Sequence, residues 1–327
     1  MYETEREFAA GVVTEACEIA RRVQTNIAAT GDAITKGDRS PVTLADLAIQ
    51  TVVSRRLAAR WPSDPLLAEE DLAPLDDDPI LTTKLLDIVR TAEPSLDERG
   101  LRQALGRGDY EGGGGRHWVL DPVDGTKGFL RGDQYAIALA LVDAGRVVVG
   151  ALGCPNLGSE YPFNEPTMGT VYSAEFNAGS SMLALDTTKE SPVTVDSITD
   201  STRARFCESV EAAHAAHSVQ GRIAAILGIE SPPVRIDSQC KYAVVARGDA
   251  SIYLRLPRDR EYREKVWDHA AGVLVIEEAG GRVSDLDGEP LDFSAGRYLA
   301  RSHGIIATNG RLHDRVLEAC REVLDLG

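Results

Sequence analysis

Apolar residues recur every three or four positions along residues 7–29, which predicts an amphipathic helix. A second helix is expected to begin near Thr43 and to end before Pro62 and Pro65. Residues 65–68 form a short apolar segment that could be a strand. Residues 72–116 are rich in loop-forming residues and contain one predicted helix, at 80–91. The first third of the chain is therefore expected to be mainly helical.

Short apolar runs replace this pattern from Trp118 onward, and they predict β-strands. Residues 118–120 end in a turn at Asp121-Pro122, and the runs 135–142 and 146–152 are joined by a Gly-containing hairpin signal. Further short strands are expected at 171–172 and 182–185.

Residues 186–203 are polar and rich in Ser and Thr, so a domain boundary is placed there. This predicts an N-terminal domain at 1–203 and a C-terminal domain at 204–327. In the second domain helices alternate with strands. The expected helices are 208–227, 241–246, 268–279 and 311–325, and the expected strands are 234–236 and 251–256.

The net charge of −16 opposes binding to a nucleic-acid polymer through a generic basic surface. No run approaches the ~20 apolar residues needed to cross a bilayer, and the acidic start of the chain differs from a signal peptide, so a cytoplasmic location is expected. The five cysteines include no C-x-x-C pair, which argues against a disulfide framework or a zinc ribbon.

Two acidic segments in the first part of the chain are candidate sites with an ordinary alternative. Asp46 follows Thr43 by three residues, which matches a helix capping box, and an acid in a first helical turn also suits the helix dipole. Glu69-Glu70-Asp71 follows an apolar segment, but such a cluster is usually a solvated loop. Both interpretations stay open at this point.

A sharper signal is the segment Asp121-Pro122-Val123-Asp124-Gly125-Thr126. A strand delivers Asp121, and the proline and glycine allow a tight turn that returns Asp124. Two carboxylates and the intervening carbonyl of Val123 are ligands that hard cations prefer. The alternative is an ordinary turn, although few turns combine two acids, a hydroxyl and an apolar strand. Asp268, at the expected start of a helix, could be a ligand or an N-cap.

Together these segments resemble the magnesium-dependent, lithium-sensitive superfamily of inositol monophosphatase and fructose-1,6-bisphosphatase. The likeness is strongest to its 3′(2′),5′-bisphosphate nucleotidase branch, and it covers nearly the whole chain. Its most specific stretches are residues 118–132, 237–242, 253–257 and 267–272. The resemblance implies a layered α/β sandwich, with an α+β domain, a smaller α/β domain and an active site between them.

The resemblance also implies roles by position. Glu69, Asp121 and the Val123 carbonyl would hold one Mg²⁺, and Asp121, Asp124 and Asp268 a second. A third, looser Mg²⁺ would contact Glu69 through water, and Li⁺ would inhibit. Asp46 and Thr126 would orient and deprotonate the attacking water. Two metal ions ~3.5–4 Å apart can generate a hydroxide and steady the leaving oxygen, so a side-chain nucleophile is unnecessary.

Further residues match substrate contacts of the nucleotidase branch. Gly125, Thr126 and Asp268 belong to them, and Ser238, Lys241 and Arg255 match contacts to the ribose and to the phosphate that is not cleaved. From the residues alone, Arg255 could be a surface residue at a strand edge and Lys241 a solvated helix lysine. His214 and His217 match a stretch that stacks on adenine, with His214 favoured. They could also bind a metal or lie free on the surface.

These features predict a monomeric Mg²⁺-dependent phosphatase that converts adenosine 3′,5′-bisphosphate to AMP and phosphate, with its 5′-phosphosulfate relative as a second substrate. The alternatives are an inositol monophosphate or 1,4-bisphosphate phosphatase and, in a different class, a non-catalytic nucleotide or metal sensor. A sensor would be expected to lack one of the acids or Thr126, and all of them are present. The expected partner is thus a small molecule, with neither nucleic-acid polymer nor membrane.

Overall fold

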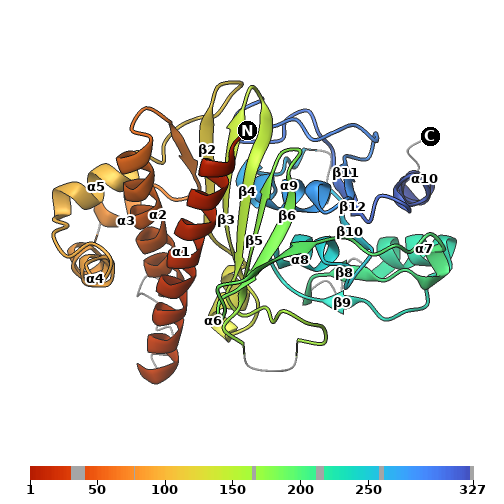
Figure 1. Cartoon of the computed structure of the whole chain (residues 1–327), viewed down its shortest axis with the longest axis horizontal. Coiled ribbons are helices and arrows are strands. Elements are labelled where there is room, and N and C mark those ends of the chain that lie inside the picture. The colour runs from red at the N-terminus through yellow and green to blue at the C-terminus, as the bar shows by residue number, and fades with distance from the viewer. Residues whose placement is uncertain (31–40, 77, 164–166, 211–216, 258–260, 325–327) are drawn as a thin grey trace.

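Two β-sheets form the framework of the computed structural model, which describes residues 1–30, 41–76, 78–163, 167–210, 217–257 and 261–324 (Figure 1). The larger sheet has seven strands in chain order, β1 to β7, and the smaller has five in the order β11-β12-β10-β8-β9. In the larger sheet β1 pairs parallel with β2, and every other neighbouring pair is antiparallel.

The strands are short, as the apolar runs of the sequence predict. The larger sheet consists of β1 (Leu66–Ala68), β2 (His117–Asp124), β3 (Ala136–Asp143), β4 (Arg146–Cys154), β5 (Thr170–Glu175), β6 (Gly179–Ala184) and β7 (Glu190–Val193). The smaller sheet consists of β8 (Phe206–Glu208), β9 (Val234–Arg235), β10 (Ile252–Arg255), β11 (Arg282–Ser284) and β12 (Ile305–Thr308).

Helices separate and cover the two sheets, so the molecule has alternating helical and sheet layers (Figure 1). On the outer face of the larger sheet lie α1 (Glu3–Thr30) and α2 (Pro41–Arg60). Between the sheets lie α8 (Cys240–Ala246) and α9 (Ala270–Glu278), and beyond the smaller sheet lie α7 (His217–Leu227) and α10 (His313–Leu324). The predicted layered α/β sandwich is confirmed.

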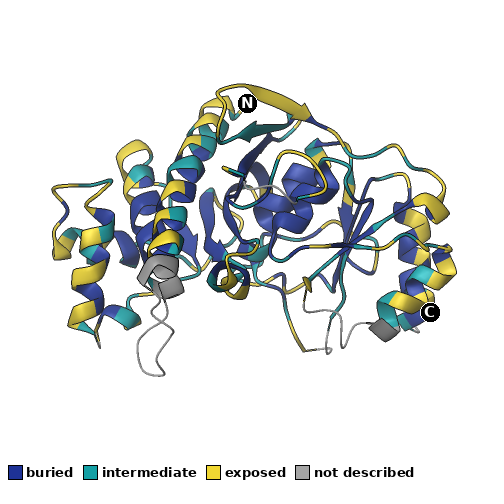
Figure 2. Ribbon diagram, turned by 90° about the horizontal axis from the view of Figure 1, so that it is seen from below, coloured by how far each residue is buried: buried dark blue, intermediate teal, exposed yellow. Residues whose placement is uncertain are grey.

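Burial follows these layers. The central helices α8 and α9 are buried almost all round, whereas the outer helices have one exposed side (Figure 2). In α9 seven consecutive residues, Ala270 to Ile276, are buried, because both faces of this helix meet a sheet. A helix that is apolar on all sides suits this central position.

Three parts of the secondary structure differ from the predictions. Residues 72–116 contain α3 (Ala73–Asp76), α4 (Pro79–Val89) and α5 (Glu98–Gly106), so the expectation of one helix there was wrong. The polar segment 186–203 contains β7, which is an edge strand with one unpaired side facing solvent and therefore lacks an apolar pattern.

The helix predicted at 208–227 was wrong at its start, because Phe206–Glu208 form β8 and the described helix α7 begins at His217. The predicted helices at 241–246, 268–279 and 311–325 are confirmed within a few residues. Among the helices of the described ranges, none is long and apolar enough to cross a membrane.

Gly150 in β4 allows α9 to pack closely on the larger sheet. A Cβ at this position would lie 2.8 Å from the backbone oxygen of Ala271. We expect Gly150→Ala to lower the free energy of unfolding by about 1–3 kcal/mol, because either the helix or the strand must shift. The measurement is urea denaturation at equilibrium.

The matched control is Gly11→Ala in α1, where an added Cβ meets no atom within 4 Å. This change should raise the free energy of unfolding by about 0.5–1 kcal/mol, because alanine is the better helix former. Equal stability of the two variants would contradict the tight contact between α9 and β4.

Candidate active site

A β-bulge near the end of β2 places the side chains of Asp121 and Asp124 on the same side of the strand. Asp121 lies opposite Ala138 and Asp124 lies opposite Ala136, so three steps along β2 match two steps along β3. In a regular strand, residues three apart point to opposite faces. The extra residue of the bulge removes this opposition, so both carboxylates reach the same site.

Gly125 ends this strand in a conformation with φ of +91° and precedes the short helix α6 (Thr126–Arg131). A Cβ on Gly125 would lie 2.8 Å from the Cβ of Ser238, which belongs to the later part of the chain. Glycine therefore provides both the turn and the close approach of the two parts.

Glu69 and Glu70 follow β1 directly and form the second acidic element. The backbone N–H of Glu69 donates to the carbonyl of Leu120 at 3.3 Å. The side-chain amide of Gln50 accepts from the N–H of Glu70 at 3.1 Å and donates to its carbonyl at 2.8 Å. Gln50 is fully buried on α2, one turn beyond Asp46, so one helix positions Asp46 and holds the acidic loop.

Asp268 arrives from the later part of the chain, at the end of the short helix η3 (Val266–Asp268). Its neighbour Trp267 is buried, and the guanidinium of Arg297 lies 4.7 Å from the centre of the Trp267 ring. Arg297 also donates to the carbonyl of Ala68 at 2.9 Å. This contact links the element that carries Asp268 to the loop that carries Glu69.

These acids lie close enough together for their charges to raise one another's pKa values. Burial raises the pKa of Asp121 well above its usual range, and the charges of Glu69, Asp124, Asp268 and Asp46 raise it further. Burial and then Asp124 raise the pKa of Asp268 to about 7. The acids predicted from the sequence to hold metal therefore come together.

Asp46 belongs to the same cluster. It is 5% exposed, and burial followed by the charges of Glu70 and Glu69 raises its pKa well above the usual range. Helix α2 begins at Pro41, so Asp46 lies past the first turn, and its alternative role at the helix N-terminus is wrong. Burial and then Glu69 also raise the pKa of Glu70 to about 7. The alternative of a plain solvated loop is wrong for Glu69 and Glu70.

The donor set fits a hard divalent cation. Its ligands are carboxylate oxygens, and the buried Oδ1 of Asp121 has no hydrogen-bond partner among the described residues. Two basic groups approach the cluster, Lys265 at 3.6 Å from Glu69 and Arg255 at 3.6 Å from Asp268. A bound cation would relieve both the repulsion and the missing partner.

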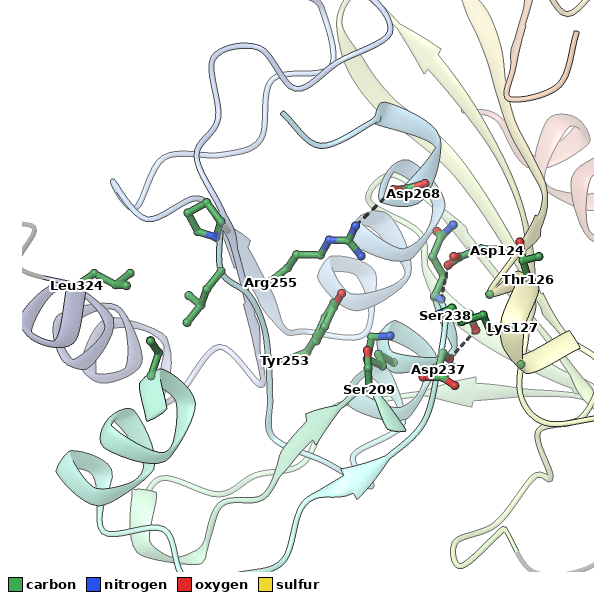
Figure 3. Close-up of a pocket in the computed structure, with 17 residues that line it drawn as sticks. Asp124, Thr126, Lys127, Ser209, Asp237, Ser238, Tyr253, Arg255, Asp268 and Leu324 are labelled. Atoms are coloured by element: carbon green, nitrogen blue, oxygen red, sulfur yellow. Dashed lines mark hydrogen bonds and ion pairs between the residues drawn. The ribbon is translucent and has the colours of Figure 1, made fainter. Parts of the chain in front are cut away.

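A cleft of about 940 Å³ opens beside the acids (Figure 3). Asp124, Gly125, Thr126, Ser238, Lys241, Arg255 and Asp268, all predicted site residues, line it. Arg255 reaches across the cleft from β10 toward Asp268 (Figure 3). Lys241 is 4% exposed, and its Nζ lies 5.5 Å from the ring centre of Tyr253. The surface alternatives for Arg255 and Lys241 are therefore wrong.

Three predicted residues need separate mention. Val123 lies in the bulge of β2 and is buried. His214 lies outside the described residues. His217 is the first residue of α7, but its side chain is not among those described. The stacking of histidine on a base stays a prediction.

Residues 1–325, which include the whole acidic cluster, match the model of the inositol monophosphatase family. The chain belongs to this family. The expected resemblance over nearly the whole chain is therefore confirmed. The site described above is the candidate active site of this chain, because it combines clustered acids with a cleft.

Curated relatives share the full length of the chain. A 3′(2′),5′-bisphosphate nucleotidase of Schizosaccharomyces pombe is 40% identical, covering 98% of this chain and 96% of the relative. Proteins with the same activity in their names are 43% identical in Oryza sativa and 44% identical in Arabidopsis thaliana. The match to the Oryza sativa protein covers 99% of this chain and 95% of that protein. The match to the Arabidopsis thaliana protein covers 98% of this chain and 96% of that protein.

Solved structures confirm the fold of the inositol monophosphatase family. Mycobacterium tuberculosis SuhB has a TM-score of 0.63 and is 21% identical, covering 99% of this chain and 98% of its own. An inositol monophosphatase from Anabaena has a TM-score of 0.61 at 20% identity, covering 98% and 96%. At this identity the likeness concerns the fold alone.

The raised pKa values predict that the acidic cluster costs stability when no cation is bound. A carboxyl group with a raised pKa in the folded state stabilises the fold below its unfolded pKa, near 4. This contribution to stability is lost as the pH rises through the pKa of the group in the folded state, which is about 7 for Asp268. In EDTA, Asp121→Asn should therefore gain stability over the parent as the pH rises from about 4 to 8.

The expected gain at pH 8 is about 1–3 kcal/mol, since one unit of pKa shift corresponds to about 1.4 kcal/mol. Chemical denaturation at several pH values measures it. Asp314→Asn serves as the control, because Asp314 is an exposed surface acid on α10. A parent that is more stable than Asp121→Asn at pH 8 in EDTA would argue against a repulsive cluster.

Proposed function

We propose that this chain is a Mg²⁺-dependent 3′(2′),5′-bisphosphate nucleotidase that converts adenosine 3′,5′-bisphosphate to AMP and phosphate. The observation that carries the proposal is the cleft, which places clustered acids next to two basic side chains, Lys241 and Arg255. The activity named for the full-length relatives at 40–44% identity supports it. We also propose 3′-phosphoadenosine 5′-phosphosulfate as a second substrate, because its phosphate and sugar present the same groups.

The acids would hold the cations. Glu69, Asp121 and the carbonyl of Val123 are proposed for one Mg²⁺, and Asp121, Asp124 and Asp268 for a second. A third ion would contact Glu69 through water. When bound, such ions activate water, cancel the charge that develops on the phosphate and steady the leaving oxygen.

Asp46 is proposed as the general base. It is buried beside Glu69 and Glu70, and as a carboxylate it can accept a proton from a water held at the cluster. Thr126 lines the cleft and would orient the attacking water through its hydroxyl group. The water oxygen would form a bond to phosphorus as the bond to the 3′-oxygen breaks, and one water proton would pass to Asp46. The 3′-oxygen would leave with the bonding electron pair and take a proton from solvent water to become the 3′-hydroxyl group of AMP.

Lys241 and Arg255 would bind the phosphate that is not cleaved. Lys241 is buried, and no described carboxylate forms an ion pair with it, so its charge suits an anionic ligand in the cleft. Ser238 lies next to Gly125 at the boundary of the two parts and would contact the ribose or phosphate. His214, with His217 as the second choice, is proposed to stack on the adenine.

We propose two domains, 1–203 and 204–327, and the division of the strands between two sheets supports this. Asp46, Glu69, Asp121 and Asp124 belong to the first and Asp268 to the second, so bound cations would tie the domains together. We further propose a monomeric cytoplasmic protein that is inhibited by Li⁺.

A second candidate is an inositol phosphatase, because solved relatives of this fold carry that name. Inositol monophosphate has no second phosphate for Lys241 and Arg255, which favours the bisphosphate substrate. A non-catalytic sensor is disfavoured by the complete set of acids and Thr126.

Phosphate release in the presence of Mg²⁺ tests the proposal. Adenosine 3′,5′-bisphosphate should be hydrolysed with a kcat/KM at least ~10-fold above that for inositol 1-phosphate or inositol 1,4-bisphosphate. Inositol 1-phosphate lacks a second phosphate for Lys241 and Arg255, and inositol 1,4-bisphosphate lacks the adenine proposed to stack on His214. A preference for an inositol phosphate would remove the nucleotidase assignment. Absence of release from all three would remove the enzyme assignment.

Asp46→Asn tests the base. The change keeps the shape of the side chain but removes the proton acceptor, so kcat should fall by roughly 10²–10⁴-fold. The affinity for adenosine 3′,5′-bisphosphate, measured by calorimetry with Mg²⁺, should change little. Turnover at the rate of the parent would refute the role of Asp46.

A further inference from the structure

A buried network lies behind Arg255. Among the described residues, Glu264, Asp268 and His269 place ligand atoms within 4.8 Å of one another, an arrangement that could suit a metal ion. Glu264 is already engaged, however. It lies 2.9 Å from Nε of Arg255 and 3.2 Å from Nε2 of His269. Glu264 and His269 therefore form hydrogen-bond partners around an arginine, whereas Asp268 stays a proposed ligand of the acidic cluster.

The hydrogen bonds continue behind Glu264. His269 is fully buried, and because a carboxylate can only accept, the Nε2–H group of His269 donates to Glu264. The hydroxyl of Tyr242 lies 2.8 Å from Nδ1 of the same ring. Tyr242 is itself fully buried. The buried side chains of His269 and Tyr242 therefore fix the position of Glu264.

Two N–H donors hold the carboxylate of Glu264, because Nε of Arg255 and Nε2 of His269 both donate to it. The side chain of Glu264 is 8% exposed, whereas that of Arg255 is 36% exposed, so the arginine is the member that faces the cleft.

The two sides of the guanidinium have different partners. Nε faces Glu264, and Nη2 lies 3.6 Å from Asp268, across the cleft (Figure 3). A free arginine side chain has about 2 kcal/mol of rotamer entropy to lose on binding an anion. Holding Nε removes part of that loss in advance and keeps the Nη groups directed at the cleft.

We propose that Glu264 is a positioning residue that fixes Arg255 for the uncleaved phosphate and so creates the preference for bisphosphate over monophosphate substrates. The inference rests on the proposed function. Without Glu264, the guanidinium is free to turn fully toward Asp268 and pair with it instead of with the substrate.

Glu264→Gln tests the inference, because it keeps the size of the side chain and its acceptor for His269 while removing the charge opposite Arg255. Steady-state kinetics are measured on adenosine 3′,5′-bisphosphate and on adenosine 3′-monophosphate, which lacks the uncleaved phosphate. We expect kcat/KM for the bisphosphate to fall about 10- to 100-fold, mainly through KM. For the monophosphate it should stay within about threefold.

Inhibition by AMP gives a binding measurement that does not depend on turnover. AMP retains the uncleaved phosphate, so its inhibition constant should rise about 10-fold in Glu264→Gln, whereas that of inorganic phosphate should not change. Glu264→Asp, which keeps the charge but withdraws it by one methylene, should show a smaller effect in the same direction. In Arg255→Lys, adding Glu264→Gln should cause little further loss.

The matched control is Asp249→Asn. Asp249 accepts from Nε of Arg247 at 2.5 Å in a comparable arginine–carboxylate pair outside the cleft, so neither substrate should be affected. Equal losses on both substrates in Glu264→Gln, or no loss on either, would overturn the positioning role. If the parent enzyme releases no phosphate from adenosine 3′,5′-bisphosphate, the proposed function itself fails, and the two failures are thus distinguished.

Discussion

The repulsion between buried carboxylates is the constraint on which the rest of the structure depends. Asp121 is almost fully buried, and Glu69, Asp124, Asp268 and Asp46 all raise its pKa. Like charges in a poorly solvated site destabilise the fold unless protons or cations neutralise them. The surrounding contacts hold the acids together against this repulsion, which is the arrangement expected of a site that binds cations.

Each of those contacts uses a specific feature of the chain. The bulge in β2 turns Asp121 and Asp124 to one side, and Gln50 holds the backbone of Glu70 with both ends of its amide. Arg297 connects Ala68 to Trp267 and so joins the loop of Glu69 to the element of Asp268. The acidic segments are therefore fixed through backbone atoms and the Trp267 ring rather than through the carboxylates themselves.

The sequence predicts most of this arrangement where the signal is local. The layered fold is confirmed. The structure also brings Asp46, Glu69, Asp121, Asp124 and Asp268 together and places Lys241 and Arg255 along the cleft, whereas the roles of these residues stay predictions. Gln50, Glu264 and Arg297 were missed, because a buried glutamine or a paired glutamate has the same local pattern as an ordinary helix or loop residue. Their roles depend on contacts between distant segments. Strand β7 was missed for a similar reason, since a polar edge strand has no apolar alternation.

Anomalous X-ray diffraction from crystals grown with Mn²⁺ in place of Mg²⁺ tests the central claim most directly. The account predicts an anomalous peak in contact with both Asp121 and Asp268, because the acids of the two parts share their cations. Mn²⁺ found only at exposed surface acids, with the cluster unchanged and without a peak, would contradict it.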